Sequence, residues 1–315
     1  MEGLMILTNE DICMKQQRGF VTLASGNIKY YKFAYYLLLS YRLKNDKYPF
    51  AIICDRENEY TAAFDDVVVL DDLKSNYLDK FRILTDSPYE ESIFIEPDCL
   101  IYRNIDHFFD ILSKEYDFTS FGWNDVEGTC FNCTEKMVPE FGEKIRTTPM
   151  FCPGYLFIRK SEVCQNIYND VLRIADWLMK YGVQDCPELL LGGKLRDDPL
   201  FFLAMRLNDC ECVAKPSVGK CIALPSVKKI KRVSIEKGQL DVVEHKEYND
   251  CALLHFSTRK CTEEGLYWQQ CISTSLCCKN APHFLIAAAE CGLTHKVLHL
   301  LKKVKYSFIH RVLKK

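Results

Sequence analysis

Residues 92–102 read SIFIEPDCLIY, and this segment decides the predicted fold. The apolar run Ile93 to Ile95 is short, which is typical of a strand buried on both faces. Pro97 has no N–H to donate to a sheet, so we expect the strand to end beside it. Glu96 and Asp98 therefore come at the carboxyl end of a central strand, which is the edge where open α/β sheets bind ligands.

The spacing of these two acids predicts a site for a divalent cation. Carboxylate oxygens are the preferred ligands of hard cations, and an ion held by them can neutralise a diphosphate. We therefore expect Glu96, Pro97 and Asp98 to form part of a donor site, in which the two acids hold Mn²⁺ or Mg²⁺ against the diphosphate of a nucleotide sugar.

The overall composition is that of an ordinary soluble globular protein. The chain has 315 residues, of which 48% are hydrophobic and 27% charged, and its net charge of −2 gives no indication of a nucleic-acid partner. No apolar run approaches the roughly 18 residues of a spanning helix. The first 18 residues contain Glu2, Glu10 and Asp11 and lack the pattern of a signal peptide, so a cytoplasmic location is expected.

Seventeen cysteines are a high number for such a chain. In a cytosol they are expected to be reduced thiols. The pairs Cys130/Cys133, Cys210/Cys212 and Cys277/Cys278 could suggest zinc, but they do not have the spacing of two-pair zinc modules. Small buried hydrophobic residues with a few exposed thiols are the preferred interpretation.

The first hundred residues show strands alternating with helices. Predicted strands cover 19–24, 49–54, 66–70 and 93–95, and predicted helices cover 30–43 and 77–85. This alternation favours an α/β fold with a mostly parallel central sheet flanked by helices.

The turn after the first strand is a candidate nucleotide site. A turn that opens a helix presents backbone N–H groups at the sheet edge, where they suit a phosphate or a base. Asp55 closes the second strand, although an acid at that position is often only a turn former. The residues expected to contact the nucleotide are Ala24, Ser25, Gly26, Asn27, Tyr30 and Asp55.

The second half of the chain supplies further candidates. Strands are predicted at 118–123, 149–158 and 253–256, a loop-rich segment at 128–146, and helices at 162–181 and from Pro199 onward. Gly154 interrupts the second of these strands, which indicates a bulge or a close approach of the backbone. Asp197 and Asp198 precede the last helix, where an aspartate is also an ordinary helix cap.

The C-terminal segment 292–315 is basic and amphipathic. Apolar residues recur at helical spacing from Val297 to Val312, with lysines on the opposite face and no acidic residue. Such a helix can lie on an anionic membrane surface, here the inner face of the cell membrane. Packing of the same stripe against the protein core is the alternative.

The ordered set of these features resembles the GT-A glycosyltransferases, and most closely the glycosyltransferase family 8-like enzymes. The resemblance runs from Gly19 to Lys260. Its motifs are the first strand and aromatic helix, the acid-x-acid motif at Glu96 and Asp98, the Phe151 strand, the Asp197-Asp198 helix start, and a late apolar strand with His255 before Arg259 and Lys260.

The resemblance implies a domain organisation. Residues 1–260 would form the GT-A domain, with a nucleotide-binding half at about 19–105 and an acceptor half at about 106–260. Residues 261–315 would form a helical, basic extension.

It also implies a metal-dependent transfer from a UDP-sugar to a saccharide or lipid-linked acceptor, with retention. His255 would join Glu96 and Asp98 at the metal, and Arg259 and Lys260 would contact the diphosphate. Lys80 and Arg82 would contact the donor, while Asp197 and Asp198 would grip sugar hydroxyls or act at the reacting centre.

Two residues depart from the family pattern. Glu96 replaces the usual first aspartate of the metal motif, and Cys152-Pro153 replaces the usual asparagine of the Phe151 strand. The first departure makes Asp98 the better candidate for direct ligation. The second weakens the transfer of acceptor-binding roles to that strand.

Other interpretations of the same residues stay open at this point. The carboxylates could serve a metal-dependent phosphatase or nucleotide-sugar hydrolase, or a glycosidase. A membrane-associated nucleotide-sugar binding protein would use the same fold without catalysis. Lys80 and Arg82 could be a solvated helix face, and His255 could be a satisfied strand histidine.

Overall fold

The computed structural model describes residues 17–45, 47–128, 134–182, 189–191, 194–214, 222–223, 230–242, 252–256 and 265–290. Contacts gather the described parts of the chain into two compact units. Unit 1 comprises Met1–Tyr35, Asp46–Pro97 and Ile105–Gly219, and unit 2 comprises Tyr36–Asn45, Asp98–Asn104 and Lys220–Lys315. The predicted boundary near Lys260 lies outside the described residues and stays a prediction.

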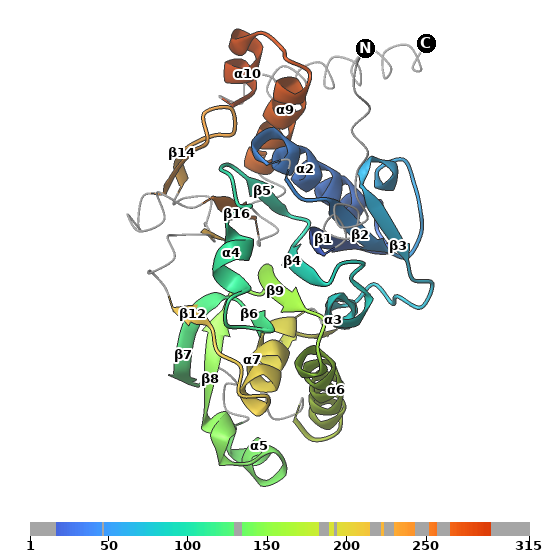
Figure 1. Ribbon diagram of the computed structural model, residues 1–315, viewed down its shortest axis with the longest axis vertical. Coiled ribbons are helices and arrows are strands. Elements are labelled where there is room, and N and C mark those ends of the chain that lie inside the picture. Colours follow the sequence, from blue (N-terminus) through green and yellow to red (C-terminus); the bar gives the residue numbers. More distant parts are fainter. Residues whose placement is uncertain are drawn as a thin grey trace, which may run out of the picture. The chain divides into compact units, whose positions relative to one another are not determined.

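A six-stranded sheet forms the centre of unit 1, in the order β3-β2-β1-β4-β9-β6 (Figure 1). The strands are β1 (Arg18–Ala24), β2 (Phe50–Cys54), β3 (Asp66–Val69), β4 (Glu91–Ile95), β6 (Phe118–Thr119) and β9 (Tyr155–Arg159). The first four in this order are mutually parallel, and β9 runs antiparallel to both of its neighbours. The predicted α/β class with a mostly parallel sheet is confirmed.

Side-chain alternation gives this sheet two buried faces. One face carries Val21, Phe94 and Leu156, which belong to the same core cluster as residues of helices α6 (Glu162–Trp177) and α7 (Asp197–Leu207). On the other face, the Phe20 ring packs edge-on against Phe109 of α4 (Phe108–Leu112), with 5.2 Å between ring centroids. Burial on both faces explains why the strand sequences read as continuous apolar runs.

Further elements of unit 1 lie around this sheet. A second sheet has the order β12-β7-β8, and β10 pairs with β11 as a short hairpin. The elements are β7 (Phe121–Glu127), β8 (Thr147–Phe151), β10 (Leu190–Leu191), β11 (Lys194–Leu195), β12 (Val213–Ala214), the 3-10 helices η1 (Thr61–Ala63), η2 (Tyr77–Arg82) and η4 (Glu143–Arg146), α3 (Ile83–Asp86), α5 (Thr134–Phe141) and the π-helical turn η5 (Leu178–Gly182).

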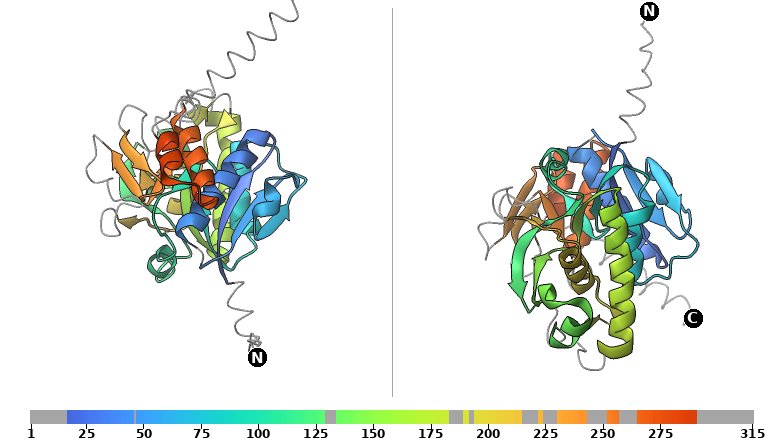
Figure 2. Two further views of the ribbon diagram at one scale, coloured as in Figure 1. Left: turned by 90° about the horizontal axis from the view of Figure 1, so that it is seen from above. Right: turned by 60° about the horizontal axis from the view of Figure 1, so that its bottom comes forward.

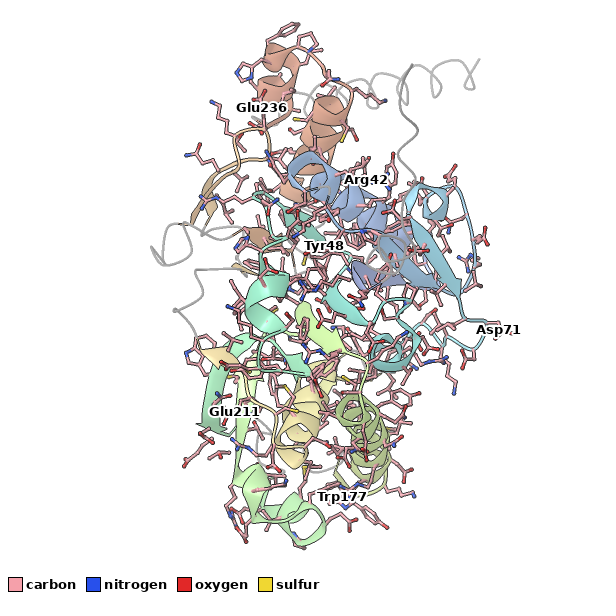
Figure 3. All side chains as sticks on the ribbon, viewed as in Figure 1. Arg42, Tyr48, Asp71, Trp177, Glu211 and Glu236 are labelled. Atoms are coloured by element: carbon pink, nitrogen blue, oxygen red, sulfur yellow. The ribbon has the colours of Figure 1, made fainter. Side chains whose placement is uncertain are left out.

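Several details of unit 1 differ from the expectation, among them the strand expected at 118–123, which is divided into β6 and β7 of different sheets. Helix α5 lies in the segment expected to be loop-rich. The strand expected at 149–158 is two strands, β8 and β9, which belong to different sheets. The long helix predicted to reach Tyr181 is α-helical only to Trp177, whose ring packs edge-on against Phe141 of α5 (Figure 3).

Unit 2 contains a three-stranded sheet in the order β13-β16-β5 and a hairpin of β14 and β15. Helix α9 packs against α10, and the two lie side by side in red-orange in the left view of Figure 2. The bounds are β5 (Cys99–Ile101), β13 (Ile222–Ala223), β14 (Ile230–Ser234), β15 (Gln239–Val242), β16 (Leu253–His255), α9 (Leu266–Cys278) and α10 (His283–Glu290).

Helix α2 (Ile28–Lys44) contributes its second half to unit 2. Ser40 on this half accepts a 2.9 Å hydrogen bond from the backbone N–H of Ile101 in β5. Among the described helices, none has the length and apolar character needed to cross a bilayer. The basic segment 292–315 lies outside the described residues.

Several cysteines are buried, which agrees with their interpretation as small hydrophobic side chains. Cys54, Cys164 and Cys271 are buried, and burial raises the pKa of the Cys54 thiol to about 11. Cys130 and Cys133 lie outside the described residues, so that pair stays untested.

Candidate functional site

The carboxyl ends of β1, β2 and β4 meet at one edge of the unit 1 sheet. The chain leaves β1 to build β2 and β3 on one side and returns to add β4 on the other, which makes the β1–β4 boundary a topological switch point. Ligands of open α/β sheets bind outside such a point. Ser25, Asp55 and Glu96 follow these three strands directly, so the topology brings these predicted residues to one edge.

The turn after β1 is fixed by Asp55. The N–H of Gly26 donates a 3.0 Å hydrogen bond to one Asp55 oxygen, and the Tyr31 hydroxyl donates to the other. Burial acts to raise the pKa of Asp55, but these two bonds outweigh it and hold the pKa below its usual value. Asp55 is therefore an ionised residue that shapes the turn, and more than a simple turn former.

Glycine is required at position 26. Its φ is +69°, and a Cβ there would lie 2.2 Å from the Ser75 hydroxyl. Asn27 caps α2, because its side-chain oxygen accepts a 2.9 Å bond from the N–H of Lys29. Ala24 is buried, and the ring of Tyr30 is half-exposed beside this turn.

Lys80 lies at the centre of a buried charge cluster in unit 1. Its ammonium donates to the carboxylates of Glu96 and Asp197, which come from the end of β4 and the start of α7. Burial acts to lower the pKa of Lys80, but the two acids more than offset it and raise the pKa. Lys80 is thus a charged, buried residue, and the alternative of a solvated helix face is wrong.

Glu96 is held through its backbone as well. Its N–H donates a 3.0 Å hydrogen bond to the carbonyl oxygen of Gly154, the residue before β9. This bond continues the β4–β9 pairing by one residue past the last strand position. Gly154 therefore lies beside the metal motif, where a close approach of the backbone was predicted. After Pro97 the chain passes from unit 1 into unit 2.

The two aspartates of α7 have different partners. Asp197 is bound to Lys80, whereas Asp198 receives two hydrogen bonds from the Arg196 guanidinium, one of them 2.9 Å from Nε to Oδ1. Burial raises the pKa of Asp198, although Arg196 opposes that shift. Both aspartates lie in the first turn of the helix, and the N-cap position is Arg196.

Arg82 does not join this cluster. It donates to Asp86 at 2.7 Å and to Asp72 at 2.6 Å, and these acids raise its pKa, with the Asp86 bond as the largest cause. A role of Arg82 toward the donor stays a prediction.

In unit 2, Asp98 meets His255. The His255 Nε2 atom lies 3.1 Å from Asp98 Oδ1, and the N–H of Phe256 donates a 3.0 Å bond to the Asp98 carbonyl. One ligand atom each of Asp98, Cys99 and His255 lies within 4.8 Å of the other two. An oxygen, an imidazole nitrogen and a sulfur so close together suit a divalent transition-metal ion.

Sequence reasoning missed three residues of these clusters. Asp79 accepts bonds from Ser25 and from the N–H groups of Lys74 and Asn76, which fixes the loop before η2. Arg196 orients Asp198. The signal for Cys99 was available, because it follows Asp98 directly within the metal motif. The predicted diphosphate contacts, Arg259 and Lys260, lie outside the described residues.

No family model and no curated protein sequence matches the chain. Among solved structures, it is similar to the bifunctional glycosyltransferase WbbM, with a TM-score of 0.48 and 10% identity over 78% of this chain. It is also similar to the galactosyltransferase LgtC in complex with donor and acceptor sugar analogs, with a TM-score of 0.47 and 11% identity over 81% of this chain and 95% of LgtC.

A third similar structure is the glycosyltransferase GlyE of Streptococcus pneumoniae, with a TM-score of 0.40 and 10% identity over 64% of this chain. The chain spans 46% of WbbM and 45% of GlyE, which is less than half of either protein. These structures belong to the enzyme class that the sequence resemblance names.

Proposed function

We propose that this protein is a metal-dependent glycosyltransferase. It moves a sugar from a nucleotide donor, UDP-linked, to a hydroxyl of a saccharide or lipid-linked glycan, with retention at the anomeric carbon. The observation that carries this proposal is the short distance between the side chains of His255 and Asp98. They lie 3.1 Å apart, although the two residues belong to separate motifs that are remote in the sequence. The charged edge of the unit 1 sheet supports it.

Asp98 and Glu96, the two acids of the motif, have different roles in this proposal. Asp98 and His255 are the residues that would hold the divalent cation, and such an ion would offset the negative charge that develops on a departing diphosphate. Glu96 is engaged by Lys80, so its part is to fix the end of β4 and the position of Lys80. This division fits the replacement of the usual first aspartate by glutamate.

The remaining residues bind and orient substrates. The turn at Ser25, Gly26 and Asn27, with Tyr30 and Asp55, receives the nucleoside part of the donor, since the switch point is the edge where such sheets bind ligands and the Asp55 carboxylate can accept hydrogen bonds there. Asp197, held by Lys80, accepts hydrogen bonds from sugar hydroxyls. Asp198 acts at the reacting centre, where the hydrogen bonds from Arg196 orient its carboxylate.

Cell location follows from the same proposal. The enzyme works in the cytoplasm and touches the inner face of the membrane through the basic segment 292–315, where lipid-linked acceptors are found. Support comes from the sequence pattern of that segment.

A thermal-shift panel of nucleotide sugars tests the function. We expect a UDP-sugar to raise the melting temperature in Mn²⁺ and to have little effect in a chelator. Release of UDP should then require an added acceptor glycan. An equal shift with and without metal contradicts the metal bridge, and full UDP release without acceptor identifies a hydrolase instead.

A further inference from the structure

The third member of the Asp98 cluster is a cysteine. Strands β5 and β16 pair antiparallel, and their register places Cys99 directly opposite His255. Asp98 is the residue before Cys99. Its backbone carbonyl accepts a hydrogen bond from the N–H of Phe256, the residue after β16. Strand pairing thus places Cys99 and His255 opposite each other, and the turn that precedes β5 brings the Asp98 carboxylate to them.

Burial distinguishes the three candidate ligands. Cys99 is fully buried and His255 is 6% exposed, while the Asp98 side chain is 24% exposed. The sulfur and the nitrogen would therefore coordinate a cation in this cluster from the buried side. Judged from the described residues, the side of the Asp98 carboxylate is the one on which solvent or a substrate oxygen reaches the cation.

We propose that Cys99 is a metal ligand, and that Asp98, Cys99 and His255 form a mixed oxygen, sulfur and nitrogen site that prefers Zn²⁺ or Co²⁺ to Mg²⁺. This proposal deepens the proposed function, because it names the kind of ion that Asp98 and His255 hold. Thiolate favours softer ions, whereas Mg²⁺ requires hard oxygen ligands in octahedral geometry. Three protein ligands leave a fourth position for a water or a phosphate oxygen.

Binding is an exchange of a proton for the ion. The Cys99 thiol loses its proton to solvent as the sulfur–metal bond forms, while Asp98 binds as the carboxylate and His255 as the neutral imidazole. No oxidant or reductant takes part. The ion affinity is therefore expected to rise with pH.

Cobalt gives a direct readout of a sulfur ligand. The full-length protein is stripped with chelator and titrated with Co²⁺ alone. We expect a near-ultraviolet thiolate-to-cobalt charge-transfer band in the wild type, and its loss in Cys99→Ser with the weaker visible bands retained. Cys54→Ser is the matched control, because Cys54 is an equally buried thiol in unit 1, and it should keep the band.

Metal preference is the second measurement. Cys99→Ser should weaken Zn²⁺ binding by at least the roughly 10–100-fold seen when a supporting residue of a metal site is lost. The Mn²⁺ affinity should change far less. A charge-transfer band of unchanged intensity in Cys99→Ser, or equal losses of Zn²⁺ and Mn²⁺ affinity, overturns the proposal.

A measurement on the wild type covers the case in which Cys99→Ser fails to fold. X-ray absorption of the protein loaded with one Zn²⁺ should show sulfur in the first shell at about 2.3 Å. A shell of oxygen and nitrogen alone overturns the proposal. The outcomes also separate the two proposals. A sulfur signal without sugar transfer leaves this site standing and removes the enzyme function, while Mn²⁺-dependent transfer without a sulfur signal does the reverse.

Discussion

The ammonium of Lys80 donates a hydrogen bond to the carboxylate of Glu96, and the two side chains are only 11% and 17% exposed. Asp197 takes a second bond from the same ammonium. One cation thus pairs with two acids in a low-dielectric interior, and each acid comes from a different part of unit 1. The start of α7 and the end of β4 are joined through this single side chain.

Replacing Lys80 with Met should strongly destabilise the protein. The change leaves two buried carboxylates without their cation, and breaking a buried pair in this way typically costs about 3–5 kcal/mol. Denaturant unfolding measures the loss. Lys136→Met, an exposed lysine of α5, is the control and should stay within about 0.5 kcal/mol of the wild type. A loss as small as that for Lys80→Met contradicts a buried, charged cluster.

Asp55 should make stability depend on pH in the acid range. Its pKa is lowered in the folded protein, because the bonds from Tyr31 and Gly26 outweigh the effect of burial. A depressed pKa adds stability above the unfolded value near 3.9, and that stability is lost as the pH falls through the folded pKa. Asp55→Asn should therefore lose roughly 1–3 kcal/mol at pH 7.

The same difference should shrink as the pH falls below about 4, where the unfolded chain binds a proton at Asp55, and should be lost once the pH passes below the lowered pKa of the folded protein. Urea unfolding of both proteins at neutral and acid pH measures it. Asp71→Asn, at an exposed position, is the control. A penalty for Asp55→Asn that is constant from neutral to acid pH would rule out the ionised state as its cause.

Asp98→Asn should abolish sugar transfer and leave the fold intact. Asn keeps the size of the side chain but removes the charge that holds the ion, so we expect a rate loss on the order of 100-fold or more. UDP release with added acceptor measures the rate, and a melting curve without metal checks the fold. Glu140→Gln, an exposed acid of α5, should be fully active. Retained turnover in Asp98→Asn would remove this residue from the site.

Phe201→Ala should destabilise unit 1 by about 3–5 kcal/mol. The Phe201 ring is fully buried, stacks on Phe118 at 5.8 Å and lies 4.3 Å from the Phe81 ring. It sits one turn after Asp197, so its loss also loosens the start of α7. Denaturant unfolding measures the change. Phe284→Ala, with a ring 69% exposed on α10, is the control, and a similar small cost for both would contradict the packing described.

Removal of residues 292–315 should weaken binding to anionic vesicles. Each Lys or Arg near such a surface contributes about 1 kcal/mol, and salt screens this attraction. Co-sedimentation at low and high salt measures binding, and transfer to a soluble acceptor should be unchanged. Vesicle binding that survives the deletion would place any membrane contact elsewhere.

Much of unit 1 could be predicted from the sequence. The strands β1, β2 and β4 are apolar runs closed by polar residues, and that pattern follows directly from burial on both faces of a parallel sheet, whereas β3 is the more exposed edge strand. Helix α5 was missed because Pro139 and its mixed polarity are typical of a loop. A single strand with a bulge or a close backbone approach at Gly154 was predicted, and pattern alone cannot tell that β8 and β9 are two strands of different sheets.

The cluster of Lys80, Glu96 and Asp197 could not be predicted from local sequence patterns. A lysine on a short helix is ordinarily exposed, and Lys80 is buried only because Glu96 and Asp197 converge on it from remote segments. The meeting of Asp98 and His255 was expected from the resemblance. The register that adds Cys99 to them is set by strand pairing, which a single sequence does not reveal.

The order of the central sheet has a consequence for synthesis of the chain. β1 pairs with β4, and β4 in turn pairs with β9. During synthesis, β1 therefore lacks its neighbour until β4 has left the ribosome, and β4 lacks its second neighbour until β9 has done so. A fragment that stops before Tyr155 would expose the β4 edge, with its row of unpaired backbone groups and apolar side chains. Such a truncated product should aggregate in the cell, and expression trials that divide this protein should keep 17–159 in one piece.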